Sequence, residues 1–307
     1  MRNIDLGNIT AAAAGSFAGV PDARRRELLQ AMVQHLHGYA LATRLSHDEW
    51  RAALAFLHRV GDISSDTRSE FSLLSDVLGL SSLVDLISCV PGNTTGGVLC
   101  NMLPGVVGIT PGGGLGITPG SVLGPFHTAG SPWRDNPADL TPGNAGQAVL
   151  MRGRVLDTQG RPLAQATLDF WQNADNGLYW QLDPAQPQDN LRCRLKVDSA
   201  ACFAIRTIRP RPYQIPTDGP VWQELIGPAG RSAWRPAHVH LIVSAPGVRT
   251  LVTELFDAED PYLDSDAVFG VREALVRRYQ RVQGVDVPVM EIDFVLGAEA
   301  PETFKET

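Results

Sequence analysis

A change in the spacing of apolar residues near Pro91 is the feature that most constrains how this chain of 307 residues can fold. Between about residues 21 and 88, apolar side chains recur every three or four positions, which is the period of amphipathic helices. After about residue 122, short runs rich in β-branched and aromatic residues alternate with turn-forming residues, which is typical of strands. The sequence therefore predicts a mainly β fold with an α-helical N-terminal region.

The helical region carries three apolar stripes. In the first, Leu28, Met32 and Leu36 follow one another at four-residue intervals. Ser46-His-Asp-Glu49 has the pattern of a capping box and predicts the start of a second helix. The third stripe lies within residues 71–87. Such stripes usually pack in a core, and part of this apolar face can instead be a surface for a partner.

The segment after residue 120 is predicted to form a β-sandwich. Its strand-like runs are short, and turn signals such as Asp157-Thr-Gln-Gly160 separate them. Many short strands at this spacing favour two packed sheets over a βαβ array, with one helix expected at 267–278. We expect a helical domain at 1–120 and a β-sandwich domain at 121–307. The predicted strands span 149–156, 166–172, 203–208, 237–243, 251–256 and 289–295.

Residues 91–120 form an insert rich in Gly, Pro and Thr. Gly108-Ile-Thr-Pro-Gly112 recurs as Gly116-Ile-Thr-Pro-Gly120, and runs of this kind resist regular structure. We interpret the insert as a mobile connection between the domains. A lid is the alternative, because the insert leads directly into Leu123-Gly-Pro-Phe126.

Charge and cysteine usage exclude several classes of partner. The net charge of −7 disfavours nucleic acid, which calls for a basic patch. No stretch reaches the ~18 apolar residues that span a membrane, and no signal peptide is expected. The four cysteines are irregularly spaced, which indicates neither a zinc site nor a disulfide framework. A protein of the reducing cytoplasm fits this pattern best.

Two histidines and two tyrosines are candidate metal ligands. In Arg235-Pro-Ala-His-Val-His240 the two imidazoles lie two residues apart on a predicted strand, so they point to the same face, about 7 Å apart. Alone they are equally compatible with a solvent-facing or hydrogen-bonded pair, and Tyr179 and Tyr213 with packing residues. Together, two phenolates and two imidazoles form a hard anionic site that suits ferric iron.

The segments around these four residues resemble the intradiol ring-cleaving dioxygenases, non-haem Fe(III) enzymes that act on catechols. The helical region is similar to the N-terminal region of the catechol branch of that family, in particular over Leu73-Leu-Ser-Asp-Val-Leu-Gly79. The other segments that carry the resemblance are Leu123-Gly-Pro-Phe126, Leu168-Asp-Phe-Trp-Gln-Asn-Ala-Asp-Asn-Gly-Leu-Tyr179, Tyr213-Gln-Ile-Pro-Thr-Asp-Gly-Pro220 and Arg235-Pro-Ala-His-Val-His240.

The resemblance implies a role for each candidate residue. It makes Tyr179, Tyr213, His238 and His240 the four iron ligands, with Tyr213 displaced by substrate and acting as a base. It places Arg235 beside the substrate, where it would stabilise developing negative charge; a structural ion pair is the alternative role. It also assigns a set of residues to the substrate pocket, namely Gly124, Pro125, Phe126, Ile215, Pro216 and Val268.

The segment 260–270 is similar to that of the hydroxyquinol-cleaving members of the family. The resemblance therefore implies cleavage of hydroxyquinol (1,2,4-trihydroxybenzene) by O2 to 3-hydroxy-cis,cis-muconate, a tautomer of maleylacetate. Catechol or a chlorocatechol is the alternative substrate. A non-catalytic β-sandwich that holds a structural metal through its histidines is the alternative of a different class.

Three features depart from the family pattern. Glu254 stands where catechol-type relatives have glutamine, so it either accepts a hydrogen bond from an extra ring hydroxyl or is a solvated strand residue. Cys193 and Ala200-Ala201 replace Gly and Asp-Gly, which leaves a hairpin without its usual turn residues. The insert before Leu123 is longer than the family norm.

The resemblance also implies partners for the helical region. Members of the catechol branch form homodimers through these helices and bind a phospholipid in an apolar tunnel between them. The stripes on the predicted helices permit both interactions.

Overall fold

The computed structural model describes residues 4–66, 68–88 and 115–298. It divides into two compact units, Met1–Arg59 and Val60–Thr307. The first unit is helical, and the second contains the predicted β-sandwich, so the expected fold class is confirmed. Most of the Gly/Pro insert, up to residue 114, lies outside the described residues.

The N-terminal unit consists of α1 (Ile9–Gly15), α2 (Ala23–Thr43) and most of α3 (His47–Ile63). The predicted capping box begins α3: Ser46 N donates to Glu49 Oε2 over 2.8 Å, and Glu49 N donates to Ser46 Oγ over 3.3 Å. No side chain of α2 is buried against the rest of the described chain. The first apolar stripe is therefore a surface in this structure and not a core.

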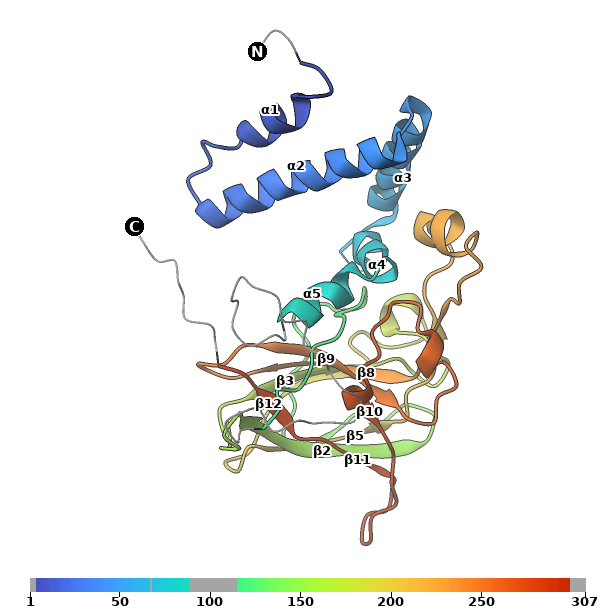
Figure 1. The fold of residues 1–307 in the computed structure, drawn as a ribbon. Helices are drawn as coiled ribbons and strands as arrows, with labels where there is room; N and C mark the ends of the chain where they lie inside the picture. The colour runs from blue at the N-terminus through green and yellow to red at the C-terminus, as the bar shows by residue number, and fades with distance from the viewer. Residues whose placement is uncertain (1–3, 67, 89–114, 299–307) are drawn as a thin grey trace. The chain divides into compact units, whose positions relative to one another are not determined.

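Two five-stranded sheets form the sandwich of the second unit (Figure 1). One sheet has the order β1-β5-β2-β11, with β12 also paired to β2, and the other has the order β10-β9-β8-β3-β4. A third, two-stranded sheet joins β6 (Tyr213–Gln214) to β7 (Trp234–Arg235). The strands of the two large sheets are β1 (Ala138–Asp139), β2 (Ala148–Asp157), β3 (Thr167–Trp171), β4 (Arg192–Lys196), β5 (Cys202–Ile208), β8 (His238–Ser244), β9 (Leu251–Asp257), β10 (Val276–Arg277), β11 (Val289–Glu291) and β12 (Phe294–Leu296).

Alternate side chains from both sheets meet in one core, as expected for a sandwich. Phe170 of β3 and Leu241 of β8 are fully buried there, together with Ile205 of β5 from the facing sheet. The intervening residues of β3 and β8, among them Trp171 and His240, face the opposite way. This outer face of the β8 sheet is where the candidate site lies.

The last predicted strand is interrupted at Ile292 and Asp293, and this step divides it into β11 and β12, which pair with β2 in the same register. There Gly153 of β2 approaches the Ile292 backbone so closely that a Cβ on this glycine would lie 1.6 Å from the carbonyl oxygen. Ile292 N donates to Arg152 O over 3.1 Å, so the step is itself hydrogen-bonded. Only glycine fits this position of β2.

The prediction of a helix at 267–278 is wrong. The segment contains only a 3-10 turn, η4 (Glu273–Leu275), followed by β10, which pairs in parallel with β9. Phe269 has a φ of 58°, and the carboxylate of Asp266 accepts a hydrogen bond from Gly270 N over 2.8 Å. A left-handed residue and a side-chain-capped turn interrupt the backbone bonds that a helix needs.

The turn at residues 198–202 is formed although the usual turn residues are missing. The carboxylate of Asp198 accepts hydrogen bonds from Ala200 N and Cys202 N, each over 2.8 Å. Ala201 takes the left-handed conformation, with a φ of 60°. An aspartate that bonds to its own following backbone therefore supplies the turn chemistry.

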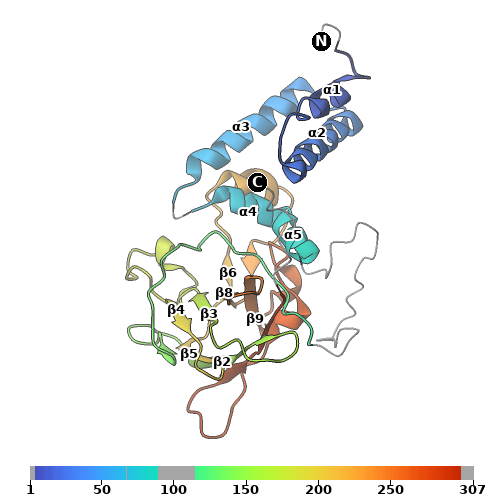
Figure 2. The ribbon, with the colours of Figure 1, turned by 90° about the vertical axis from the view of Figure 1, so that its left-hand side faces the viewer.

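Helices α4 (Glu70–Val77) and α5 (Leu80–Ser88) belong to the second unit and lie on the side of β6, β8 and β9 (Figure 2). Buried Glu70 accepts from Val221 N, the first residue of the π-helical turn η2 (Val221–Ile226), over 3.3 Å. Ser82 donates to Phe269 O over 2.8 Å. The third apolar stripe is thus partly core, because Leu73 is buried, and partly exposed along α5.

The described end of the insert, residues 115–120, is held along the sandwich. Leu115 N donates to Thr158 O over 2.8 Å, and Thr118 N donates to Val295 O over 3.0 Å. The interpretation of the insert as mobile is therefore wrong for these six residues, and for residues 91–114 it stays a prediction.

Gly153→Ala is expected to lower the free energy of unfolding by about 3 kcal/mol, because the new methyl group overlaps a backbone carbonyl that cannot move aside. Urea denaturation measures the change. Gly38→Ala, an exposed helical glycine with open space around it, is the control and should raise stability by about 0.5–1 kcal/mol. A Gly153→Ala protein as stable as wild type would contradict the close approach.

Candidate metal centre

Strand β8 places His238 and His240 on its outer face, as the two-residue spacing predicts. The residues between and after them, Val239 and Leu241, point into the sandwich core. Both histidines are nevertheless only 1 % exposed, since loops cover the outer face. Their Nε2 atoms lie 3.1 Å apart, which is a separation that one cation can bridge.

The two predicted tyrosines converge on the same point. Tyr179 immediately precedes the 3-10 turn η1 (Trp180–Leu182), and its hydroxyl lies 3.1 Å from His240 Nε2. The ring centroid of Tyr213, on β6, lies 5.4 Å from that of Tyr179 and 5.5 Å from that of His238. Four side chains from three separate segments therefore surround one small volume.

Asn173 ties the two tyrosine loops together. Its side-chain nitrogen donates to Arg211 O over 2.8 Å, and its side-chain oxygen accepts from Arg211 N over 3.1 Å. Asn173 lies six residues before Tyr179, and Arg211 lies two before Tyr213. Because both groups of Asn173 are used, this clamp fixes the spacing of the two phenols.

Burial sets the charges of the four candidate ligands. It lowers the pKa of His238 to about 4 and the pKa of His240 well below its ordinary value, so both imidazoles are neutral. It raises the pKa of Tyr179 well above 10 and also raises that of Tyr213. Ionising two enclosed phenols requires a cation between them, and this donor set fits a trivalent metal ion.

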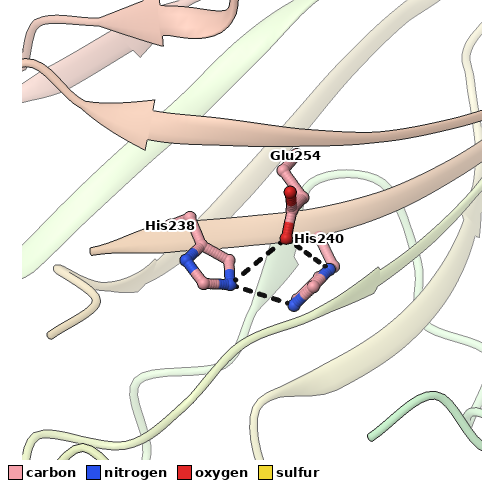
Figure 3. Close-up of side chains that lie close together, drawn as sticks. All are labelled: His238, His240 and Glu254. Carbon is pink, nitrogen blue, oxygen red and sulfur yellow. Dashed lines mark hydrogen bonds and ion pairs between the residues drawn. The ribbon is translucent and has the colours of Figure 1, made fainter. Parts of the chain in front are cut away.

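Glu254 of β9 is a fifth possible donor that the sequence reasoning did not assign to the metal. Its Oε1 atom lies 3.4 Å from His238 Nε2 and 3.4 Å from His240 Nδ1 (Figure 3). His238, His240 and Glu254 also form a group that could hold a metal, with ligand atoms within 4.8 Å of one another. The residue is fully buried, so the interpretation of Glu254 as a solvated strand residue is wrong.

Arg235 lies between two buried carboxylates. Its Nη1 donates to Glu254 Oε1 over 2.8 Å, and its Nε donates to Asp266 Oδ1 over 3.0 Å. The structural ion pair considered for Arg235 is therefore present. Asp266 could not be predicted as a partner of Arg235, because the two residues are 31 positions apart and nothing in the local sequence of Asp266 marks it.

Strand pairing arranges the site in a row. Arg192, Trp171, His240 and Glu254 are successive cross-strand partners on β4, β3, β8 and β9. The Trp171 ring stacks on the His240 imidazole at 4.9 Å with an interplanar angle of 3°. His240 Nδ1 has no hydrogen-bond partner among the described residues, so this stack and the nearby carboxylate fix the ring.

The predicted pocket residues surround the tyrosines to differing degrees. The Phe126 ring stacks on Tyr179 at a centroid distance of 4.5 Å. Gly124 has a φ of 72°, and a Cβ there would lie 3.1 Å from His240 Cε1. Ile215 and Val268 are buried, whereas Pro125 and Pro216 are partly exposed.

Asp76 of α4 is a further buried carboxyl group near the site that the sequence reasoning missed. Burial raises its pKa to about 6, and the charges of Arg235, Glu254 and Asp266 act on it. An acidic residue in the middle of an apolar helical stripe is a signal that could have identified Asp76. Helix periodicity alone does not show which face of the helix the rest of the protein covers.

Two family models match this chain. Residues 122–298 match the family model described as Dioxygenase, and residues 22–90 match the model described as Catechol dioxygenase N terminus. The chain belongs to the intradiol dioxygenase family. The two matches together span every described strand and every described α-helix except α1.

Three relatives illustrate the similarity. The chain is 38% identical over 301 residues to a 6-chlorohydroxyquinol 1,2-dioxygenase of Cupriavidus pinatubonensis, covering 96% of this chain and 99% of the relative. It is 39% identical over 263 residues to a hydroxyquinol 1,2-dioxygenase of Rhizobium sp., covering 85% and 81%. The solved structure of a hydroxyquinol 1,2-dioxygenase from Pseudomonas putida superposes with a TM-score of 0.76 at 40% identity, covering 96% and 99%.

Asp266→Ala is expected to lower the free energy of unfolding by about 3–5 kcal/mol, because it removes one partner of a buried ion pair and leaves two backbone N–H groups without an acceptor. Urea denaturation is the measurement. Asp264→Ala, at an exposed position two residues earlier, should change stability by less than about 0.5 kcal/mol. Equal effects of the two substitutions would rule out a structural role for the Asp266 pair.

Proposed function

We propose that this protein is a non-haem Fe(III) dioxygenase that cleaves hydroxyquinol between its adjacent hydroxyl groups and incorporates O2, giving 3-hydroxy-cis,cis-muconate. The observation that carries the proposal is the convergence of two buried phenols on two neutral imidazoles. The relatives named above support the ring, since they are hydroxyquinol and 6-chlorohydroxyquinol 1,2-dioxygenases.

Tyr179, Tyr213, His238 and His240 would hold the iron. When bound, the ion supplies Lewis acidity that ionises the phenols and the ring hydroxyls and draws electron density from the ring. The tyrosines and the neutral histidines provide two negative charges in all, which favours the ferric over the ferrous state. The Asn173 clamp and the Trp171 stack would keep the donors in place when one of them leaves.

Tyr213 is the residue best suited to leave and to take up a substrate proton. It is the more exposed of the two phenols, at 6 % against 2 % for Tyr179. It is paired along the backbone with Arg235, whose charge lowers the pKa of the Tyr213 phenol against the effect of burial. A phenolate released there can accept a proton from the ring hydroxyl and return it later.

The covered outer face of β8 would exclude water from the reaction. Phe126 and Ile215 are buried apolar side chains next to the tyrosines, so they would form apolar walls beside a bound ring. Arg235 lies at 3.3 Å from His238 Nε2, on the edge of the same volume. We assign Gly124, Pro125, Pro216 and Val268 to the remaining walls, and Glu254 to the edge of the pocket beside the two histidines.

The test below distinguishes the proposed function from an alternative substrate and an alternative function. Catechol or a chlorocatechol is the alternative substrate; a solved catechol 1,2-dioxygenase from Pseudomonas arvilla superposes with a TM-score of 0.74 at 26% identity. A non-catalytic zinc module is the alternative function, in which His238, His240 and Glu254 would supply three of the donors.

Oxygen uptake with hydroxyquinol, catechol and chlorocatechols tests the proposal, with each product identified by its ultraviolet spectrum. The iron-loaded protein should be coloured, since phenolate-to-iron charge transfer absorbs visible light, whereas a zinc module is colourless. Colourless protein that consumes no O2 would sink the proposal. Faster cleavage of catechol than of hydroxyquinol would replace the substrate and keep the reaction.

Tyr213→Phe is expected to lower kcat by about 10²–10⁴-fold and to weaken the visible band, because it removes one phenolate and the proton acceptor. Steady-state kinetics and visible absorption of the iron-loaded protein measure both. Tyr39→Phe, at a tyrosine of α2 that is 59% exposed, is the matched control and should change neither. An unaltered band in Tyr213→Phe would remove this residue from the ligand set.

We also propose that the helical region mediates a homodimer and holds a phospholipid between subunits. Leu28, Met32 and Leu36 on α2 are 53%, 49% and 57% exposed, so a row of apolar side chains at four-residue spacing is exposed in the described chain. No helix among the described residues is long and apolar enough to cross a membrane. The free thiols of Cys193 and Cys202 suit the cytoplasm as the location.

Met32→Glu is expected to weaken the dimer about tenfold or more, because a charge replaces an apolar contact in the centre of that face. Sedimentation equilibrium measures the dissociation constant, and mass spectrometry of an organic extract identifies bound lipid. Gln34→Glu, an exposed position on the same helix, is the control. A wild-type protein that is monomeric at micromolar concentration would contradict the dimer.

A further inference from the structure

The charges of the buried residues beside the candidate metal centre do not sum to zero. Arg235 carries one positive charge, and Glu254 and Asp266 both form ion pairs with it. All three residues are at most 8 % exposed, so solvent screens them weakly. With both carboxylates ionised, this cluster carries a net charge of −1 next to the two histidines. The guanidinium is thus already neutralised before any substrate arrives.

Glu254 is the member of the cluster that is nearest to the metal ligands. One oxygen lies 3.4 Å from a nitrogen of each imidazole, whereas neither oxygen of Asp266 is paired with a histidine among the described residues. The carboxylate also follows His240 directly across the sheet, so strand pairing fixes its position. A negative charge at this position acts on the metal through both histidines.

The contacts of Glu254 leave it little freedom to turn toward a ring. Its Oε1 accepts from Arg235 Nη1 over 2.8 Å, and its Oε2 accepts from Arg235 Nη2 over 3.1 Å and from Ser121 Oγ over 2.6 Å. Gly270 lies against the pair, and even a Cβ there would be 2.8 Å from Glu254 Oε2. A ring hydroxyl would have to displace one of these partners.

We propose that Glu254 is a positioning residue that sets the electron demand of the metal centre, and so selects electron-rich rings by its charge and not by contact. This inference rests on the proposed function and deepens it. A buried anion near the metal stabilises the ferric state over the ferrous state and lowers the reduction potential.

The consequence for the substrate follows from the direction of electron flow. Ring cleavage requires electron density to leave the ring, and a centre of lower potential withdraws less of it. A third hydroxyl group donates density to the ring and offsets this deficit, whereas a chlorine substituent withdraws density and adds to it. The carboxylate therefore favours hydroxyquinol over chlorocatechols without touching the hydroxyl group that distinguishes them.

Glu254→Gln in the iron-loaded protein tests the inference without substrate. It should raise the reduction potential and shift the phenolate-to-iron band to longer wavelength, because the ferric state loses a stabilising anion. Glu254→Asp, which keeps the charge, should stay close to wild type in both properties. Glu291→Gln, a glutamate of β11 whose side chain is 62% exposed, is the matched control and should change nothing.

A series of catechols without a third hydroxyl group separates charge from contact. For Glu254→Gln, the ratio of kcat/KM for 4-chlorocatechol to that for 4-methylcatechol should rise about tenfold over wild type. A direct hydrogen bond from Glu254 to the third hydroxyl group predicts an unchanged ratio, because neither compound carries that group. An unchanged ratio, or an unchanged potential and band, would overturn the inference.

Asp266→Asn is a second variant that tests the inference if the Glu254→Gln protein does not fold. It removes one negative charge from the same cluster without altering a group paired with the histidines, so it should shift the potential in the same direction by a smaller amount. A shift in the opposite direction would count against the inference. Loss of ring cleavage and of colour in the wild-type protein would instead refute the proposed function, so the two failures are distinguishable.

Discussion

The antiparallel pairing of β8 with β3 and β9 is the constraint on which the rest of the site depends. Cross-strand neighbours in adjacent antiparallel strands share a face, so this pairing sets Trp171, His240 and Glu254 side by side. A slip of one residue in either register would turn the histidines into the sandwich core and break both the stack and the charge contact. The inter-sheet core, with Phe170 and Leu241 fully buried, makes such a slip costly.

Loops then convert an exposed sheet face into an enclosed site. The tyrosine loops, the segment around Phe126 and the turn after Asp266 all lie over the outer face of β8, and the side chains beneath them are almost completely buried. Enclosure strengthens every charge interaction and shifts the pKa values of imidazoles and phenols in opposite directions. The lowered pKa values keep the imidazoles neutral, so they can bind a metal. The raised pKa values mean that the phenols ionise only when a cation lies beside them. Arg235, neutralised by its two carboxylates, adds no net positive charge to the site.

Several elements could be predicted from sequence because local rules decide them. The capping box at Ser46 forms as expected, and the strands that carry the histidines and Trp171 lie within one or two residues of their predicted bounds. The helix expected at 267–278 was wrong because a side-chain-capped turn at Asp266 replaces the backbone bonds. The final strand was expected to be continuous, and only its contact with Gly153 explains the step. Glu254 was recognised as unusual, but neither its partner Arg235 nor its nearness to both histidines follows from its position in the chain.

The sequence by itself determined the types of candidate donor, their order along the chain and the face of β8 that carries the histidines, since side-chain alternation along a strand needs no knowledge of neighbours. It also determined family membership, because the motifs around the tyrosines and histidines are local. Only the tertiary structure decided which charges meet: Arg235 finds Glu254 and Asp266 from 19 and 31 residues away. Pairings between distant strands and loops depend on sheet register and loop closure, and those are properties of the whole packed chain.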